Sequence, residues 1–320
     1  MHHKLTRKPE PVASAAANWP PLRRFIAAEH RLGLEMAQGR STAALYEFFR
    51  FGVKQAWACL FGGIAVALMI GTWRFYPPDA ALARYDFLFL AMLAVQVALL
   101  AGRLETWEEA RVILIYHVVG TAMEVFKTSV GSWIYPEPSI FHIGGVPLFS
   151  GFMYSCIGSY ICRCWRLFNF RFARHPRRLS LIALSVAIYV NFFSHHYVID
   201  LRWLLFAWAI WLFGRARVHF KVWTRYRAMP LLLGLVLVSL FIWFTENIGT
   251  FTKTWLYPSQ RLGWSMVSID KLGSWFLLLI VSYTLVSLVN APLVRRGESA
   301  GAGVRRRDDE AAGGMSLPTL

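Results

Sequence analysis

The stretch MEVFKTSVGSWIYPEP, from Met123 to Pro138, places an ionisable Glu124 inside an apolar run. A second stretch, TENIGTFTKTWLYPSQ, from Thr245 to Gln260, repeats the pattern. In both copies the Glu stands nine residues before a Trp and eleven before a Tyr, and Pro follows the Tyr directly. Because an internal repeat sets how the rest of a fold is interpreted, we predict that the two copies lie on equivalent helices.

Composition predicts the class of protein that carries this repeat. Of the 320 residues 56% are apolar and 16% are charged, whereas charged residues make up about a quarter of soluble domains. Eight segments are apolar enough to be helices that cross about 30 Å of hydrocarbon. They are 58–73, 87–102, 111–129, 146–162, 179–194, 202–214, 229–247 and 275–294. We therefore predict an all-α polytopic membrane protein with about eight transmembrane helices, of which the sixth is short.

The distribution of basic residues predicts the orientation. With the N-terminus in the cytoplasm, 27 of the 34 Lys and Arg lie on the inner side and seven on the outer side. This bias follows the positive-inside rule, so we expect both termini in the cytoplasm and the chain in the cytoplasmic (inner) membrane. The net charge of +16 then requires no nucleic-acid partner. Membrane lipid is the expected partner, including anionic head groups.

The domain organisation follows from the spans and the repeat. Residues 1–40 are expected to form a cytoplasmic segment that is partly disordered, because residues 1–20 mix Pro, Ala and charged residues. No cleavable signal peptide is expected, because about fifty polar or mixed residues precede the first span. Residues 41–162 form the first membrane repeat, which begins with an amphipathic elbow helix at the inner interface. Residues 163–294 form the second repeat, and 295–320 a disordered tail.

The repeat also predicts the symmetry of the two halves. Residues 124–151 map onto 246–273 with a constant offset of 122, and LAGR (100–103) matches LFGR (212–215) with an offset of 112. Four spans in each half is an even number, so the halves are expected to be parallel and related by a pseudo-two-fold axis along the membrane normal. Both Glu-bearing helices then end on the outer side.

The two glutamates are the candidate catalytic residues. His117, Thr121, Glu124 and Thr128 recur every three or four residues and so share one helix face. A charged side chain at the bilayer centre costs on the order of 2.5–3.5 kcal/mol, so we expect Glu124 and Glu246 to face the bundle interior. They are interpreted as general acids, proton carriers or cation ligands. The alternative is a structural role in helix contacts, with each Glu hydrogen-bonded across the symmetry axis or, for Glu124, paired with Lys127.

The candidate substrate-binding residues surround these glutamates. They are His117, Thr128, Trp133 and Tyr135 in the first copy, and Thr250, Trp255 and Tyr257 in the second. Aromatic faces stabilise cations and hold apolar chains, which suits a substrate wall. The alternative is an interfacial aromatic belt at the outer membrane boundary.

The segment SHHYVIDLRW (194–203) supplies weak candidates for a metal site. His195, His196 and Asp200 lie close together in the sequence, and these residue types bind zinc or iron. Adjacent histidines point apart on a helix, however, so no metal site is assigned. Asp200 and Arg202 are expected to form a surface ion pair or a helix start.

Five stretches together resemble the bacterial family of unknown function numbered 817, the YoaT-like membrane proteins. They are FGVKQAWACLFGGI (51–64), GTAMEVFKTSVGSWIYPE (120–137), VPLFSGFMYSCIGSYICRCWRLFNF (146–170), VNFFSHHYVIDLRWLLFA (190–207) and WFTENIGTFTKTWLYPSQRLGWSMVSIDKLGSWFLL (243–278). The resemblance covers about residues 45 to 292 and implies an integral membrane protein, without an activity to transfer.

A shorter segment is similar to membrane carotenoid hydratases. Their order of a helix Glu, a Gly, a Tyr and then GVP matches Glu124, Gly131, Tyr135 and GGVP (144–147), and the match departs at Lys127 and WIYPE (133–137). This similarity implies acid chemistry on a polyene, with Glu124 protonating a double bond and aromatic rings stabilising the carbocation.

These patterns lead to one functional hypothesis and two alternatives. The first is a membrane-embedded enzyme that uses Glu124 and Glu246 for acid–base chemistry on a lipid or isoprenoid. The second is a proton- or cation-coupled transporter of a small solute. The third is a membrane binding or assembly factor. The sequence identifies no cofactor.

Overall fold

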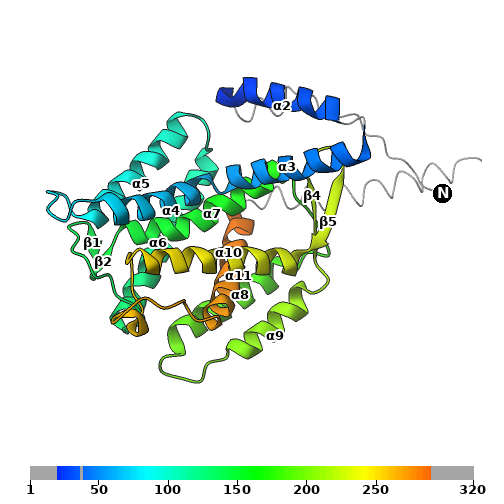
Figure 1. Cartoon of the computed structure of the whole chain (residues 1–320). Coiled ribbons are helices and arrows are strands. Elements are labelled where there is room, and N and C mark those ends of the chain that lie inside the picture. Colours follow the sequence, from blue (N-terminus) through cyan, green and yellow to red (C-terminus); the bar gives the residue numbers. More distant parts are fainter. Residues whose placement is uncertain (1–19, 37–38, 290–320) are drawn as a thin grey trace, which may run out of the picture. The chain divides into compact units, whose positions relative to one another are not determined.

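The computed structural model describes residues 20–36 and 39–289 (Figure 1). Within these ranges the chain is predominantly helical, as the hydrophobic pattern predicts. The predicted disorder of residues 1–20 and of the C-terminal tail falls outside the described residues, apart from Pro20, which begins the short 3₁₀ helix η1 (Pro20–Leu22).

The eight segments predicted as spans correspond to helices over most of the residues that the structure describes. They are α4 (Leu60–Phe75), α5 (Arg84–Ala101), α6 (Trp107–Ser129), α7 (Phe149–Phe168), α8 (Arg178–Ser194), α9 (Arg202–Phe213), α10 (Leu231–Phe251) and α11 (Asp270–Val289). Two more helices precede them where the sequence shows an amphipathic pattern, α2 (Arg23–Met36) and α3 (Arg40–Ala58). A further 3₁₀ helix, η2, spans Pro258–Gln260.

Length and composition identify the helices that are able to cross a membrane. Four of the described helices meet this condition alone, namely α5, α6, α10 and α11. The segments Ser41–Ala58 and Leu60–Phe75 meet it together, as a pair bent by 67° that would count as a fifth span. Helices α8 and α9 are apolar but shorter. The structure therefore has the features of a membrane protein with four or five such helices.

Short strands correct the all-α prediction. β1 (His142–Ile143) and β2 (Val146–Pro147) form a small antiparallel pair. β3 (Arg171–Ala173), β4 (Arg217–Lys221) and β5 (Tyr226–Pro230) form a three-stranded sheet in the order β3-β4-β5. Phe172 of β3 pairs with Val218 of β4, 46 positions away. A pairing this distant leaves no local periodicity, and the basic segments that form it were interpreted only as connections between spans.

The chain folds into two compact units that interleave along the sequence. The first comprises residues 1–168, 221–226 and 248–265, and the second comprises residues 169–220, 227–247 and 266–320. Helix α10 belongs to both, because the division falls between Asn247 and Ile248.

In the first unit, α6 and α7 make the most extensive helix contact. A Cβ added to Gly120 would lie 2.6 Å from the Tyr154 ring, and one added to Gly158 would lie 3.0 Å from Tyr116. Small residues at such positions let two helix backbones approach closely. The apolar core beside this pair is formed by residues of α4 to α7, namely Phe61, Ala65, Met92, Leu99, Ile113 and Phe152.

In the second unit, α8 packs against α9 and α11. The Ser185 hydroxyl hydrogen-bonds the Thr284 hydroxyl across the α8/α11 contact at 2.9 Å. Where the chain leaves β3, the His175 ring and the Tyr283 hydroxyl are 2.7 Å apart. Polar side chains therefore join elements inside this unit, as is common between helices that lie in a membrane.

Candidate functional site

Glu124 lies in the last two turns of α6 with 3% of its surface exposed. Its Oε2 atom accepts hydrogen bonds from Trp133 Nε1 at 2.6 Å and from the Tyr135 hydroxyl at 2.7 Å. Its Oε1 atom accepts one from the Tyr154 hydroxyl at 2.7 Å. An indole N–H can only donate, so Oε2 acts as an acceptor. The structure brings Glu124 together with two predicted partners, Trp133 and Tyr135.

The end of α6 turns the chain back toward Glu124. The Ser132 amide donates to the Lys127 carbonyl at 2.9 Å, and the Gly131 amide to the Thr128 carbonyl at 3.0 Å. Gly131 has a φ of 72°, the left-handed conformation that glycine adopts most readily in a Schellman turn. The turn reverses the chain direction, so that side chains nine and eleven residues after Glu124 reach its carboxylate.

Helix α7 supplies the third donor. Tyr154 lies over Gly120, where a Cβ would be 2.6 Å from the Tyr154 ring. The sequence did not predict Tyr154 as a partner of Glu124. Tyr154 lies in another predicted span, outside the segment whose Glu, Trp and Tyr spacing is repeated.

Two other predicted residues on α6, His117 and Thr128, do not hydrogen-bond the Glu124 carboxylate within the part of the chain that the structure describes. The His117 ring packs against Phe152, with centroids 4.5 Å apart. His117 Nδ1 and Thr128 Oγ1 are buried and have no hydrogen-bond partner among the residues that the structure describes. Both atoms are therefore polar groups with unused hydrogen-bonding capacity.

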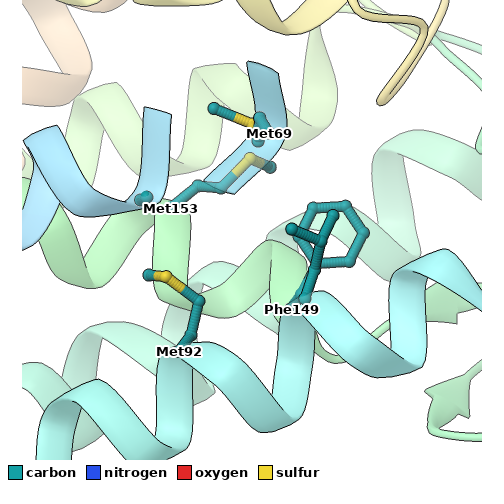
Figure 2. A pocket seen from close by; sticks show the side chains of 6 residues that line it. Met69, Met92, Phe149 and Met153 are labelled. Carbon is teal, nitrogen blue, oxygen red and sulfur yellow. The ribbon is translucent and has the colours of Figure 1, made fainter. Parts of the chain in front are cut away.

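An apolar cavity lies beside Tyr135, one of the residues that hydrogen-bond Glu124; Figure 2 shows the side chains that line it. It is lined by residues of three helices, α4, α5 and α7, namely Ala65, Met69, Leu88, Met92, Phe149 and Met153. The Phe149 ring also packs against Tyr135, with centroids 6.0 Å apart and the rings nearly perpendicular. The cavity volume is about 10 Å³, about the room that one water molecule needs. Sequence reasoning missed these methionines, because apolar residues in spans look alike.

The second glutamate has a different set of partners. Glu246 belongs to the second unit, is 4% exposed, and accepts a hydrogen bond from Trp275 Nε1. Trp275 follows Glu246 by 29 positions, not by nine as Trp133 follows Glu124. The predicted partner, Trp255, instead packs over Gly249, where a Cβ would lie 2.0 Å from the indole ring. The Glu–Trp contact of the first copy is therefore not reproduced by Trp255.

The other predicted residues of the second copy lie in the first unit. Thr250 is fully buried and accepts a hydrogen bond from Trp264 Nε1 at 3.1 Å. The Tyr257 ring contacts the Trp133 ring at a centroid distance of 6.0 Å. Between these aromatic residues, Ile134 and Leu256 form an isolated antiparallel bridge.

Helix α10 ends with the same turn as α6. The Thr254 amide donates to the Gly249 carbonyl at 2.9 Å, and the Lys253 amide to the Thr250 carbonyl at 3.1 Å. These donors and acceptors stand 122 positions after those of the α6 turn. Lys253, at the position of Gly131, has a φ of 54°, which is uncommon for a residue with a side chain.

The weak metal candidates make other contacts. His195 Nδ1 lies 2.9 Å from the Asn191 carbonyl, and Asp200 pairs with Arg202 at 3.1 Å, as predicted. Burial raises the pKa of Asp200, but hydrogen bonds from Asn191 and Arg202 and the Arg202 charge outweigh it, so the pKa lies below its usual value. Among the described residues, no group of three or more His, Cys, Asp or Glu is arranged to hold a metal ion.

A buried ionic cluster at the far end of α6 and α7 was also missed. Arg163 and Glu105, whose side chains are both fully buried, form an ion pair of 3.1 Å, and Glu105 also accepts a hydrogen bond from Gln96. Arg166 and Glu109 form a second pair of 3.1 Å. The positive-inside count treats both arginines as loop charges, whereas α7 extends to Phe168 and contains them.

Together, the apolar helices and the buried polar site define a helical membrane protein with an enclosed carboxylate. The chain belongs to the family described as "Protein of unknown function (DUF817)", whose model matches residues 47–283. It is 41% identical over 245 residues to "Uncharacterized protein YoaT" of Bacillus subtilis (strain 168). The matched region covers 76% of this chain and 92% of that protein. No solved structure matches the chain. The similarity to carotenoid hydratases stays a prediction.

Proposed function

We propose that this protein is a multi-pass membrane enzyme in which Glu124 performs acid–base chemistry on a lipid or isoprenoid. The observation that supports this most directly is the buried Glu124 carboxylate, held by three side-chain donors next to an apolar cavity. Ionisable residues inside a membrane are costly and are functional by default. A cavity without charged lining residues suits a hydrocarbon substrate rather than a polar one.

Tyr135 links the carboxylate to the cavity. Its hydroxyl donates to Glu124, and its ring packs against Phe149, which lines the cavity. In the proposed step, Tyr135 gives its hydroxyl proton to one carbon of a substrate double bond and takes a proton from protonated Glu124. The rings of Tyr85 and Phe149, 5.1 Å apart, then stabilise the carbocation through their π faces. Loss of a proton from a neighbouring carbon, through Tyr135 back to the Glu124 carboxylate, forms the new double bond and restores the acid.

The methionines make room for the substrate. Met side chains are unbranched and adapt to irregular shapes, and three of the six lining residues are Met69, Met92 and Met153. Figure 2 shows their side chains around the same cavity as Phe149. In this proposal the small cavity expands by rotation of these side chains when an alkyl or isoprenoid chain enters.

The proposal includes the architecture in which this site is placed. It has eight spans in two parallel four-span halves, residues 41–162 and 163–294, with both termini on the cytoplasmic side of the inner membrane and an elbow helix before the first span. The matching turns at Gly131 and Lys253 support the duplication. Glu246, with Trp275, is the proposed acid of the second half.

Mass spectrometry of ligands that co-purify with the protein tests the enzyme proposal. Wild type, Glu124→Gln and Tyr135→Phe are purified in a mild detergent, with Glu108→Gln, an exposed carboxylate on the same helix, as the matched control. We expect an apolar lipid or isoprenoid in every sample, with the reacted species lost in Glu124→Gln and reduced in Tyr135→Phe. Identical ligand profiles in wild type and Glu124→Gln would contradict the proposal.

Reporter fusions test the proposed topology. A reporter that is active only in the cytoplasm, fused after Val289, is expected to be active, and one inserted between Trp133 and Pro138 is expected to be inactive. A C-terminal fusion that is active only outside the cytoplasm would overturn the orientation without affecting the assignment of Glu124.

A further inference from the structure

The α6/α7 contact in the first unit carries polar side chains at several levels along its length, between apolar residues such as Val112 and Phe152. At one end Glu124 accepts a hydrogen bond from Tyr154. At the other end, Glu105 pairs with Arg163 and Glu109 with Arg166. Small and hydroxyl-bearing residues are common in the contacts between membrane helices, whereas ionisable residues there are costly and rare. A series of polar groups from end to end calls for a functional explanation.

On α6, Thr121 lies about one helical turn before Glu124, and His117 lies about one turn before Thr121. A Cβ on Gly151 of α7 would lie 2.5 Å from Thr121 Oγ1 and 2.7 Å from His117 Nδ1, so both side chains face the same point on α7. Thr121 Oγ1 donates to the His117 carbonyl at 2.7 Å, whereas His117 Nδ1 is buried and has no hydrogen-bond partner among the described residues. An imidazole with a free nitrogen inside a polar helix contact is available to accept or release a proton.

Two serines of α7 continue the series toward the ionic cluster. Ser155 Oγ lies 2.8 Å from the Ile113 carbonyl and 3.1 Å from the Gly151 carbonyl. One turn further on, Ser159 Oγ lies 3.3 Å from Glu105 Oε1, the same oxygen that pairs with Arg163. Gly151, Ser155 and Ser159 therefore follow one another at about one helical turn on α7, roughly 5.4 Å, a gap that a single water molecule bridges. On α6, His117 and Glu124 are about two turns apart, with Thr121 between them.

Both ends of this series reach partly exposed groups. The Arg166 side chain is 20% exposed, so the ionic cluster is accessible from one end of α7. At the other end, the Glu124 carboxylate is bonded to Trp133 and Tyr135, which are only half-buried. Because α6 is long and apolar enough to cross a membrane, the two ends are expected to lie toward opposite faces of it.

We propose that the α6/α7 contact conducts protons across the membrane, with His117 as the central relay. This activity goes beyond the enzyme proposed above and does not depend on it. The Glu105 carboxylate takes up a proton at the Arg166 end and passes it through the Ser159 and Ser155 hydroxyls and intervening water to one ring nitrogen of His117. The other ring nitrogen releases a proton toward Glu124, and Glu124 in turn releases it at the end of α6 where Trp133 and Tyr135 lie. Each group gives up one proton for each that it accepts, so no group gains net charge.

Proton flux into liposomes tests this inference. Full-length protein is reconstituted into vesicles of phosphatidylcholine and phosphatidylglycerol that contain a pH-sensitive dye, and a potassium diffusion potential drives proton entry. We expect the wild type to acidify the lumen faster than protein-free vesicles do. His117→Phe is expected to lower the protein-dependent rate by about 10²-fold or more, the usual effect of removing a positioned proton-transfer group.

Two further variants serve as a second test of His117 and as a control. His117→Gln preserves the polarity of the side chain but cannot relay a proton, so it carries the test if His117→Phe does not fold. His219→Gln, on β4 of the second unit, is the matched control and is expected to conduct as the wild type does. A wild-type rate equal to that of protein-free vesicles, or an unchanged rate in a folded His117 variant, would overturn the inference. Ligand retention without proton flux would also overturn it and leave the enzyme proposal standing.

Discussion

Ile134 and Leu256 exchange two backbone hydrogen bonds of 2.9 Å each, although 122 positions separate them in the chain. They hold the same place in the two Trp-x-Tyr-Pro segments. When each residue of an antiparallel pair bonds its own counterpart, a local two-fold axis passes between the two. The pairing brings the ends of both copies together inside one unit, and it supports the proposed duplication at the level of a single residue pair.

Lys253 occupies a position that favours glycine. Its φ of 54° is left-handed, its side chain is exposed, and its counterpart is Gly131. A side chain in this conformation costs about 1–2 kcal/mol, partly offset by the flexibility of glycine in the unfolded chain. We expect Lys253→Gly to stabilise the protein by about 0.5–1 kcal/mol, measured as a higher thermal unfolding temperature in detergent.

Matched substitutions separate the backbone effect from the loss of charge. Lys253→Ala removes the charge and keeps the Cβ, so it is expected to leave the unfolding temperature nearly unchanged. Gly131→Ala is expected to destabilise by about 1 kcal/mol, since its Cβ would meet no atom within 4 Å and only the positive φ opposes it. Equal stabilisation by Lys253→Gly and Lys253→Ala would refute the backbone explanation.

Glu124 and Tyr154 are expected to be energetically coupled. Glu124→Gln replaces one acceptor oxygen with an NH₂ group, which faces donors that it cannot satisfy. Leaving buried polar groups unsatisfied costs about 1–3 kcal/mol, and Tyr154→Phe removes one of those donors. We therefore expect the double variant to lose less stability than the sum of the two single variants, by about 0.5–3 kcal/mol. Additive losses in chemical unfolding would show that the 2.7 Å contact contributes no coupling.

The sequence predicted the helices of this fold better than their connections. A long apolar run indicates a buried or membrane-spanning helix whatever its neighbours in the fold are. The local pattern was therefore enough to predict the positions of α4 to α11. The β3-β4-β5 sheet depends on partners far apart in the chain, such as Phe172 and Val218, and it was missed. Arg163 was misassigned to a loop because its charge suggests exposure, whereas Glu105 neutralises it inside the fold.

The candidate site was predicted in part for a similar reason. Spacing within one segment linked Glu124 to Trp133 and Tyr135, and the structure brings them together. Tyr154 comes from another helix, so no spacing in the sequence pointed to it. For Glu246 the same spacing suggested Trp255, but the hydrogen bond comes from Trp275 of α11. Equal spacing within two segments does not determine which neighbouring helix packs against each one.

Gly249 of α10 is expected to tolerate no side chain without a loss of stability. A Cβ at this position would lie 2.0 Å from the Trp255 indole, and Trp255 is 8% exposed, so the ring has little room to move. We expect Gly249→Ala to destabilise by about 1–3 kcal/mol, the usual cost of overpacking, or to prevent folding. Gly71→Ala on α4 is the control, since its Cβ meets nothing within 4 Å. It should stabilise the helix by up to about 1 kcal/mol, and equal effects of both substitutions on thermal unfolding would contradict the steric argument.

Asp200 is expected to make the turn before α9 sensitive to acid. Its lowered pKa means that it stabilises the turn above the pKa of an unfolded Asp, about 3.9, and that this contribution is lost as the pH falls through the folded value. We expect Asp200→Asn to speed hydrogen exchange of the Arg202 amide, which donates to Asp200 at 2.9 Å. At pH 7 the loss of stability of the turn in Asp200→Asn is expected to be below about 1 kcal/mol, because the Asp200–Arg202 ion pair is partly exposed.

The comparison across pH provides the check on this turn. Wild type and Asp200→Asn are expected to exchange at the same rate once the pH is below the folded pKa, because the wild-type carboxyl is then neutral. Asp79→Asn, in the exposed loop after α4, should match the wild type at every pH. A difference between wild type and Asp200→Asn that persists unchanged into acid would show that charge is not the cause.

The Glu105–Arg163 pair is expected to be more costly to break than to remove. Both side chains are fully buried, so Arg163→Met leaves an unpaired carboxylate in the interior, a change that costs about 3–5 kcal/mol. Adding Glu105→Gln removes that charge and keeps an acceptor for Gln96, so the double variant should recover most of the stability. Arg111→Met, an exposed position on α6, is the control and should change the unfolding temperature little. If the double variant is no more stable than Arg163→Met, lost packing of the arginine side chain, rather than the unpaired charge, accounts for the damage.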